Sequence, residues 1–173
     1  MATASLVLTL IGPNTTGIVS RVARIVADHD ANWLGARMAN LAGQFAGIVQ
    51  IELPDSNVDA FAAALRGLEA IGMRFMVARG EAPDTLGTTD LVHLELVGQD
   101  HPGIVRDIAA ALASRGVSIE QLVSDRVSGA FSGEALFKAA AQLRVPNDVP
   151  AAELRAALES VALELMVDIT FDR

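Results

Sequence analysis

Two glycine-bounded turns carry the residues best suited to chemistry in this chain. The first runs from Gly12 to Gly17 and the second, 86 residues later, from Gly98 to Gly103. Each turn follows an apolar segment and precedes an Ile-Val pair that opens a helical pattern. Backbone N–H groups at the start of a helix lack intrahelical partners, and the helix dipole favours negative charge there. The sequence therefore predicts, at each turn, a site for a carboxylate or another small anion.

The four boundary glycines also have a purely structural explanation. Gly12 and Gly98 would permit unusual backbone angles, whereas Gly17 and Gly103 would allow a helix and a strand to approach closely. The glycine spacing alone does not decide between this explanation and a ligand site.

Other kinds of site find little support. His29, His93 and His101 fall at a helix end, in a strand and in the second turn, a spacing that does not fit a metal site. The chain has no cysteine, which excludes disulfides, thiolate metal sites and cysteine nucleophiles. No Gly-x-Ser-x-Gly motif accompanies the serines. We therefore predict a protein that is not an enzyme and needs no metal or cofactor; His101 either contacts a ligand or is solvated.

Charge and hydropathy narrow the class of partner. The net charge is −8, from 13 basic and 21 acidic residues, and Lys138 is the only lysine. Direct binding to nucleic acid normally needs a basic face, so it is not expected here. No segment approaches the roughly 20 apolar residues of a membrane span, and the start of the chain lacks a signal-peptide pattern. These features favour a cytoplasmic protein.

The elements that position the turns follow a β-α-β-β-α-β order in each half. In the first half we expect strands at 5–11, 32–41, 45–53 and 73–77, and helices at about 17–29 and 57–72. In the second half we expect strands at 90–97, 117–126, 134–145 and 163–171, and helices at 103–115 and about 150–161. Thr16 is the expected N-cap of the first helix. Residues 80–89 are polar, rich in Gly, Pro and Thr, and aperiodic, so they are expected to link unit 1–79 to unit 90–173.

The repeat extends beyond the turns. Phe45 to Asp55 matches Phe137 to Asn147 at an offset of 92, because the second hairpin is about six residues longer. Each unit is therefore expected to be an α+β ferredoxin-like sandwich, with an antiparallel four-stranded sheet and two helices on one face.

The second turn carries a motif with a known counterpart. The order strand-Gly-x-Asp-x-Pro-Gly-Ile-Val-helix, followed by Gly116-Val117-Ser118-Ile119, resembles the ACT domain. The resemblance covers both halves and implies βαββαβ modules that bind amino acids for regulation. Two such units without a catalytic or DNA-binding segment resemble the glycine cleavage system transcriptional repressor family.

Carried over residue by residue, the resemblance implies a ligand carboxylate held by turn and helix N–H groups, and an Asn32 or Ser118 side chain facing the same cleft. Asp100 would receive the ligand ammonium or accept hydrogen bonds from its own turn. Asn14 replaces that Asp in the first unit, Thr16 replaces the Pro, and Ser118 stands where many members carry Asn. Arg21 and Arg106 are left outside the site. The implied ligand-binding residues are Gly12, Asn14, Thr16, Gly17, Ile18, Asn32, Gly98, Asp100, His101, Pro102, Gly103, Ile104 and Ser118.

The leading functional hypothesis is a regulatory protein that binds a small amino acid, with glycine the first candidate, where ACT units meet. Occupancy would control a protein partner such as a DNA-binding regulator, so that transcription is affected indirectly. Exposed edge strands favour a homo-oligomer. The alternatives are a ligand-independent interaction module and a separate regulatory subunit of a metabolic enzyme.

Overall fold

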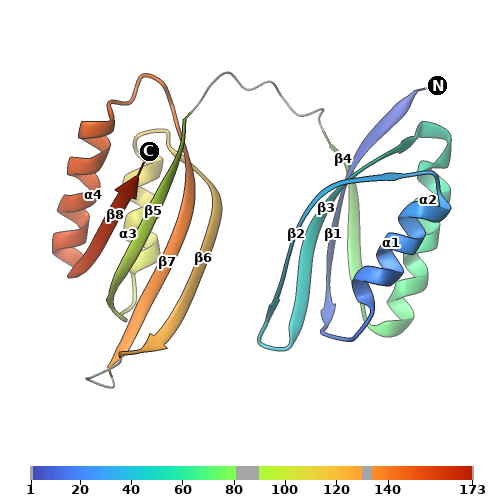
Figure 1. Ribbon diagram of the computed structural model, residues 1–173, viewed down its shortest axis with the longest axis horizontal. Helices are drawn as coiled ribbons and strands as arrows, with labels where there is room; N and C mark the ends of the chain where they lie inside the picture. The colour runs from blue at the N-terminus through green and yellow to red at the C-terminus, as the bar shows by residue number, and fades with distance from the viewer. Residues whose placement is uncertain (1, 81–89, 130–133, 173) are drawn as a thin grey trace. The chain divides into compact units, whose positions relative to one another are not determined.

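The chain divides into two compact units that repeat one order of elements (Figure 1). This computed structural model describes residues 2–80, 90–129 and 134–172. The first unit contains β1 (Thr3–Pro13), α1 (Ile18–Asp28), β2 (Asn32–Leu41), β3 (Gln44–Pro54), α2 (Val58–Leu65) and β4 (Arg74–Arg79), with short 3-10 helices η1 (Asp55–Asn57) and η2 (Arg66–Ile71) flanking α2. The second contains β5 (Asp90–Gln99), α3 (Ile104–Ala113), β6 (Ser118–Ser128), β7 (Ala135–Val145), α4 (Ala151–Leu165) and β8 (Val167–Asp172).

Each unit is built on an antiparallel four-stranded sheet. The strand orders are β2-β3-β1-β4 and β6-β7-β5-β8, so β2 and β6 are equivalent edge strands. The predicted α+β fold of two ferredoxin-like βαββαβ units is confirmed. Of the predicted linker, residues 81–89 lie outside the described residues; Gly80 still donates its amide to the Ser5 carbonyl at 2.8 Å.

The helices of each unit cover one face of its sheet (Figure 1). Along β1 every second residue is buried, as a two-residue strand period requires. The α1 residues Ile18, Val22 and Val26 recur at intervals of four and are also buried, which turns one helical face toward that sheet. Burying each such side chain stabilises the fold by roughly 1.5–3 kcal/mol.

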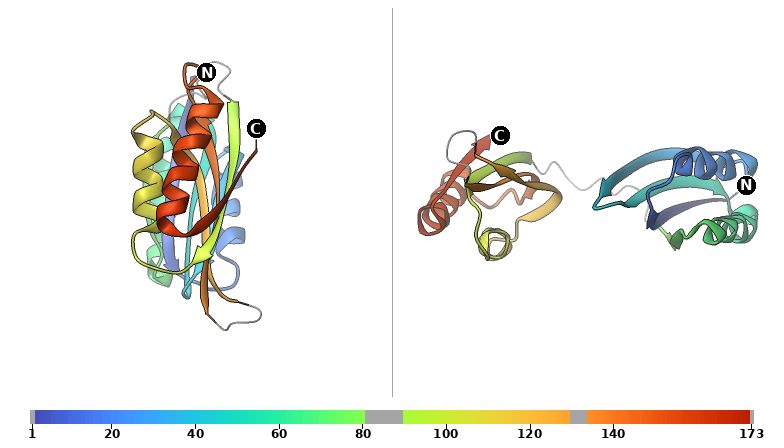
Figure 2. Two further views of the ribbon diagram at one scale, coloured as in Figure 1. Left: turned by 90° about the vertical axis from the view of Figure 1, so that its left-hand side faces the viewer. Right: turned by 90° about the horizontal axis from the view of Figure 1, so that it is seen from below.

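The second unit repeats this arrangement with its own core. Ile104, Ile108 and Leu112 form the buried stripe of α3, and Leu154 and Leu158 begin that of α4. The two helices lie side by side over the sheet (Figure 2). No helix in the described parts of the chain is long and apolar enough to cross a membrane.

The helix expected at about 57–72 is α-helical only to Leu65 and continues as the 3-10 helix η2, and the predicted start of the last strand is wrong. The sequence predicted a strand from Leu163, but α4 continues to Leu165 and the strand starts at Val167. Leu, Glu and Ala are good helix formers, and the buried stripe of α4 continues through Ala162 to Leu165. The helix ends only at Met166, whose φ of 53° is left-handed.

Candidate functional site

The two glycine turns end in the same backbone conformation. Gly17 and Gly103 are the N-caps of α1 and α3, with φ values of +88° and +105°. Neither cap includes a side-chain hydrogen bond, so the prediction that Thr16 caps the first helix is wrong. A left-handed N-cap favours glycine because it has no Cβ.

Among the described residues, several amides at the turns and helix starts have no backbone hydrogen bond outside the sheets. The Asn14 amide donates to the Gly43 carbonyl at 3.0 Å, and the Asp100 amide donates to the Ala135 carbonyl at 2.9 Å. The first amides bonded within the helices are those of Arg21 and Asp107, which donate to Gly17 and Gly103. The intervening N–H groups, including those of the buried Ile18 and Ile104, therefore have no helical acceptor.

Each turn lacks one amide, but at a different place, because its proline is Pro13 in the first turn and Pro102 in the second. Pro102 has no N–H, whereas its counterpart Thr16 has one. Thr16 and Pro102 are both exposed, and Asn14 is exposed as well.

Gly12 and Gly98 have a different role from the N-cap glycines. A Cβ on Gly12 would lie 2.9 Å from the Gly72 carbonyl oxygen, and a Cβ on Gly98 would lie 2.9 Å from the Val167 Cα. Nothing lies within 4 Å of a Cβ built on Gly17. The proposed structural roles are therefore reversed: Gly12 and Gly98 allow close packing, and Gly17 and Gly103 permit the backbone angle.

Asp100 forms an ion pair with Arg126 on β6, at 2.8 Å. The carboxylate is thus paired with a side chain of β6, a partner that the sequence analysis did not predict, while the Asp100 amide donates to the Ala135 carbonyl. At the offset of 86 the equivalent residues of the first unit are Asn14 and Asn40. The second turn is thus held to the edge strand by charge, and the first has no carboxylate there.

His101 connects its turn to the end of α4. Its Nε2 lies 2.9 Å from the Leu165 carbonyl oxygen, and its Nδ1 lies 3.2 Å from that of Pro102. These hydrogen bonds raise the pKa of His101, and the carboxylates of Asp100 and Asp107 act in the same direction. His101 is therefore engaged within its own unit, an outcome outside the two predicted alternatives.

Arg106 and Asp107 lie over the start of α3. The Arg106 guanidinium donates twice to the Asp107 carboxylate, at 2.7 and 3.1 Å. It also lies beside Gly103, because a Cβ added to that glycine would be 3.1 Å from an Arg106 Nη atom. This pairing holds the pKa of Asp107 below its usual value. Sequence reasoning left Arg106 out, although side chains in a first helical turn lean toward the N-terminus.

Asn32 and Ser118 lie far from the turns of their own units. Asn32 pairs with Glu52, which pairs with Ser5 near the start of β1. Pro13, at the turn, lies eight steps along β1 from Ser5, a span of roughly 26 Å at about 3.3 Å per residue. Ser118 likewise pairs with Arg144 at the end of the sheet away from its turn.

Ser118 lies beside a charged pair on its own sheet. Ser118 is hydrogen-bonded to Glu120, whose pKa is lowered mainly by hydrogen bonds from Arg144. Glu120 stands at a β-bulge, because the pairing register shifts between Ile119 and Gln121. Asn32 is exposed.

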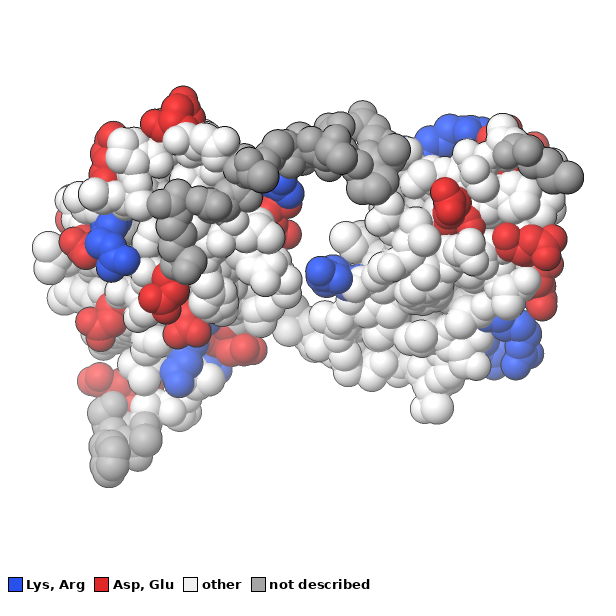
Figure 3. All heavy atoms as spheres, turned by 45° about the horizontal axis from the view of Figure 1, so that its top comes forward, with Lys and Arg blue, Asp and Glu red and all other residues white. Residues whose placement is uncertain are grey.

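The described surface shows neither a basic face nor a grouped set of metal ligands (Figure 3). On the surface shown in Figure 3, Lys and Arg occur singly or in small groups among more numerous Asp and Glu, and they form no basic face. Among the described residues, no three His, Asp or Glu side chains are grouped to hold a metal ion. Both turns offer an anion backbone N–H groups, and the second turn also has the Arg106 guanidinium beside Gly103.

Comparison with known proteins identifies the family to which this chain belongs. The ACT-domain family model matches residues 4–78. A crystal structure of an unknown protein from Galdieria sulphuraria is 30% identical, has a TM-score of 0.86 and is matched over 99% of this chain and 98% of its own. A candidate glycine cleavage system transcriptional repressor is 21% identical with a TM-score of 0.74, over 99% of this chain and 98% of its own, which shows a shared fold. No curated protein sequence matches the chain. The chain belongs to the ACT-domain family, with one ACT unit in each half.

Proposed function

We propose that this chain is a cytoplasmic regulatory protein, not an enzyme, that binds an amino acid at its glycine turns. The observation that carries the proposal is the repeated αL glycine, Gly17 or Gly103, followed by helix amides that have no carbonyl partner. Such amides favour a carboxylate. Glycine is the first candidate because a structure of the same fold is described as a candidate glycine cleavage system repressor.

The position of Asn32 supports a site completed by a second copy. Asn32 starts edge strand β2, and the end of β2 lies beside the turn, because Leu41 and Pro13 both pair with Gln44. If two copies pair antiparallel along β2 about a two-fold axis, Asn32 of one copy approaches the turn of the other. Its amide would then supply a donor and an acceptor to the ligand.

Signalling would follow from that shared site. A ligand held by two copies stabilises the paired arrangement. The size of this effect is set by how much more tightly the ligand binds the pair than the separate copies. The excess of acidic over basic residues favours a protein partner, such as a DNA-binding regulator, over direct contact with DNA.

One observation favours the alternative of a ligand-independent interaction module. Asp100 is already paired with Arg126, and its counterpart in the first unit is the uncharged Asn14. Neither turn therefore offers an unpaired carboxylate for a ligand ammonium at this position.

Thermal unfolding in the presence of each of the twenty amino acids, followed by calorimetry, tests the proposal. A ligand at 100 times its dissociation constant stabilises the folded state by about 2.7 kcal/mol. With glycine we expect a rise in Tm that Asn32→Ala removes and that Asp59→Ala, on the exposed face of α2, preserves. No rise with any amino acid would reject the sensor in favour of the interaction module.

A further inference from the structure

The second unit contains an apolar cavity of about 30 Å³ between α3 and the inner face of its sheet. Its walls come from α3, β5, β6 and β7, and every lining residue is apolar. Val105, Ile119 and Leu122 line it while remaining 45%, 36% and 45% exposed, so apolar side chains also form its surface rim.

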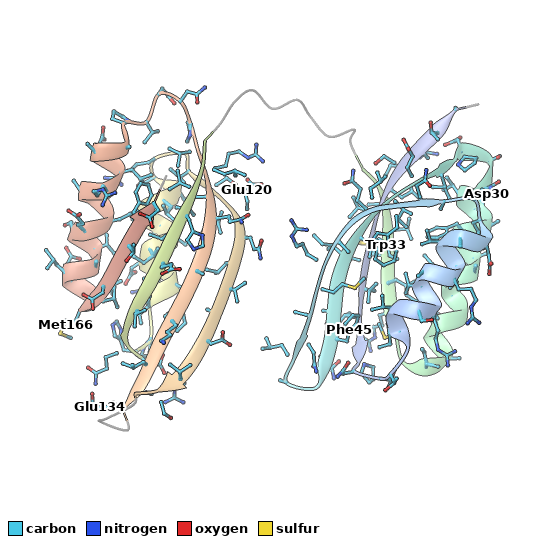
Figure 4. All side chains as sticks on the ribbon, viewed as in Figure 1. Asp30, Trp33, Phe45, Glu120, Glu134 and Met166 are labelled. Atoms are coloured by element: carbon cyan, nitrogen blue, oxygen red, sulfur yellow. The ribbon has the colours of Figure 1, made fainter. Side chains whose placement is uncertain are left out.

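Two positions of β2 carry larger side chains than the equivalent positions of β6. At the offset of 86, Trp33 stands at the position of Ile119 and Met38 at that of Ser124. Both pack against the core of the first unit, and Met38 lies directly on Gly47. Trp33 lies on the helix side of its sheet (Figure 4). Ile119, which lines the cavity, is smaller than Trp33, and Ser124 is smaller than Met38, whereas the lining residue Leu122 is larger than its counterpart Ala36.

The size and place of the cavity define what fits it. A group the size of a water molecule needs roughly 10–15 Å³ of such space, so the cavity accepts two or three small groups, about the size of an isopropyl group. A cavity with no polar lining favours aliphatic groups over hydroxyls or charges. Ile104 and Val105, which directly follow the N-cap Gly103, are part of its wall.

We infer that the second unit selects an amino acid with a compact branched aliphatic side chain, which enters this cavity while the carboxylate lies at the start of α3. The inference rests on the proposed function and adds which amino-acid side chain the second unit would select. The first unit carries the bulkier Trp33 and Met38 at the positions of Ile119 and Ser124, so that unit suits a ligand without a side chain, such as glycine.

Calorimetric titration of the full chain with L-valine, glycine and L-aspartate tests the inference. Ile119→Trp and Ser124→Met each give the second unit the side chain found in the first, and Val123→Met adds bulk on the opposite face of β6, where it pairs with Ala140. We expect valine to bind the native chain, and either cavity-filling variant to weaken it at least tenfold. Val123→Met should change its affinity less than twofold, and glycine affinity should be unchanged in all three variants.

The outcomes separate this inference from the proposed function. Binding of glycine without valine, or valine affinity unchanged in both folded cavity-filling variants, would overturn the inference alone. Absence of binding by all twenty amino acids would overturn the proposed function, and the inference with it. Far-UV circular dichroism establishes folding, and Ser124→Met, at an exposed position, serves if Ile119→Trp does not fold.

Discussion

The Nε2 atom of His101 lies 2.9 Å from the carbonyl oxygen of Leu165, which ties the second glycine turn to the last residue of α4. The other ring nitrogen faces the Pro102 carbonyl at 3.2 Å. A neutral imidazole has a single N–H, so only the protonated ring donates to both carbonyls. The first unit has Thr15 at this position and lacks the titratable group.

The His101 contact predicts a loss of stability as the pH rises. Its pKa is raised by the Leu165 and Pro102 carbonyls, and the facing carboxylates of Asp100 and Asp107 add to the effect. A raised pKa means that the contribution is complete below about 6.5, the unfolded value, and is lost as the pH rises through the folded value. Between pH 6 and pH 8 we expect the calorimetric Tm of the native chain to fall more than that of His101→Gln.

The single tryptophan supplies an internal control for this prediction. Trp33 belongs to the first unit, so its fluorescence follows the unfolding of that unit. His101→Gln should leave the fluorescence transition unchanged at every pH. Equal pH dependence in the native chain and the variant would contradict the role given to His101.

The two kinds of glycine predict different costs of substitution in one unit. In Gly12→Ala the new Cβ meets the Gly72 carbonyl and the Met73 sulfur, so we expect a loss of about 2–3 kcal/mol from overpacking. In Gly17→Ala the space is open and only the left-handed angle is strained, a cost of about 1 kcal/mol. Urea unfolding followed by Trp33 fluorescence compares them directly, and a larger cost for Gly17→Ala would contradict the assignment.

These glycines also show what the sequence can and cannot predict. Its repeat identified both turns, both βαββαβ units and most element boundaries, because strand and helix periodicities are local. The reasons for the glycines were reversed, since the closeness of Gly98 to Val167 depends on pairing between strands 69 residues apart. The Arg126 partner of Asp100 was missed for the same reason, as it comes from a strand beyond α3. Likewise, Asn32 and its turn share a unit but lie at opposite ends of the sheet, which only the register reveals.

The ion pair between Asp100 and Arg126 should contribute little to stability. The Arg126 side chain is 71% exposed and that of Asp100 29%, so solvent screens the attraction. A double-mutant cycle with Asp100→Asn and Arg126→Asn, the residues of the first unit, should give a coupling of about 0.2–1 kcal/mol that shrinks in high salt. A coupling that is independent of salt would show that the pair acts through packing instead of charge.

Met166 is the position where a glycine should stabilise the second unit. Its φ of 53° is left-handed, and its side chain is 74% exposed and points away from the unit (Figure 4). The first unit carries Gly72 at this corner, with φ of 83°. Because the left-handed angle costs an L residue about 1–2 kcal/mol and glycine loses more chain entropy on folding, we expect Met166→Gly to stabilise by about 0.5–1 kcal/mol.

The reciprocal change tests the same reasoning in the first unit. Gly72→Ala keeps the left-handed angle and places a Cβ 3.3 Å from the Pro13 ring, so it should destabilise that unit by about 1–2 kcal/mol. Trp33 fluorescence measures this loss in urea, and calorimetry of the full chain measures the gain in Met166→Gly. If Met166→Gly lowered stability instead, the packing of the methionine at the end of α4 would outweigh its backbone strain.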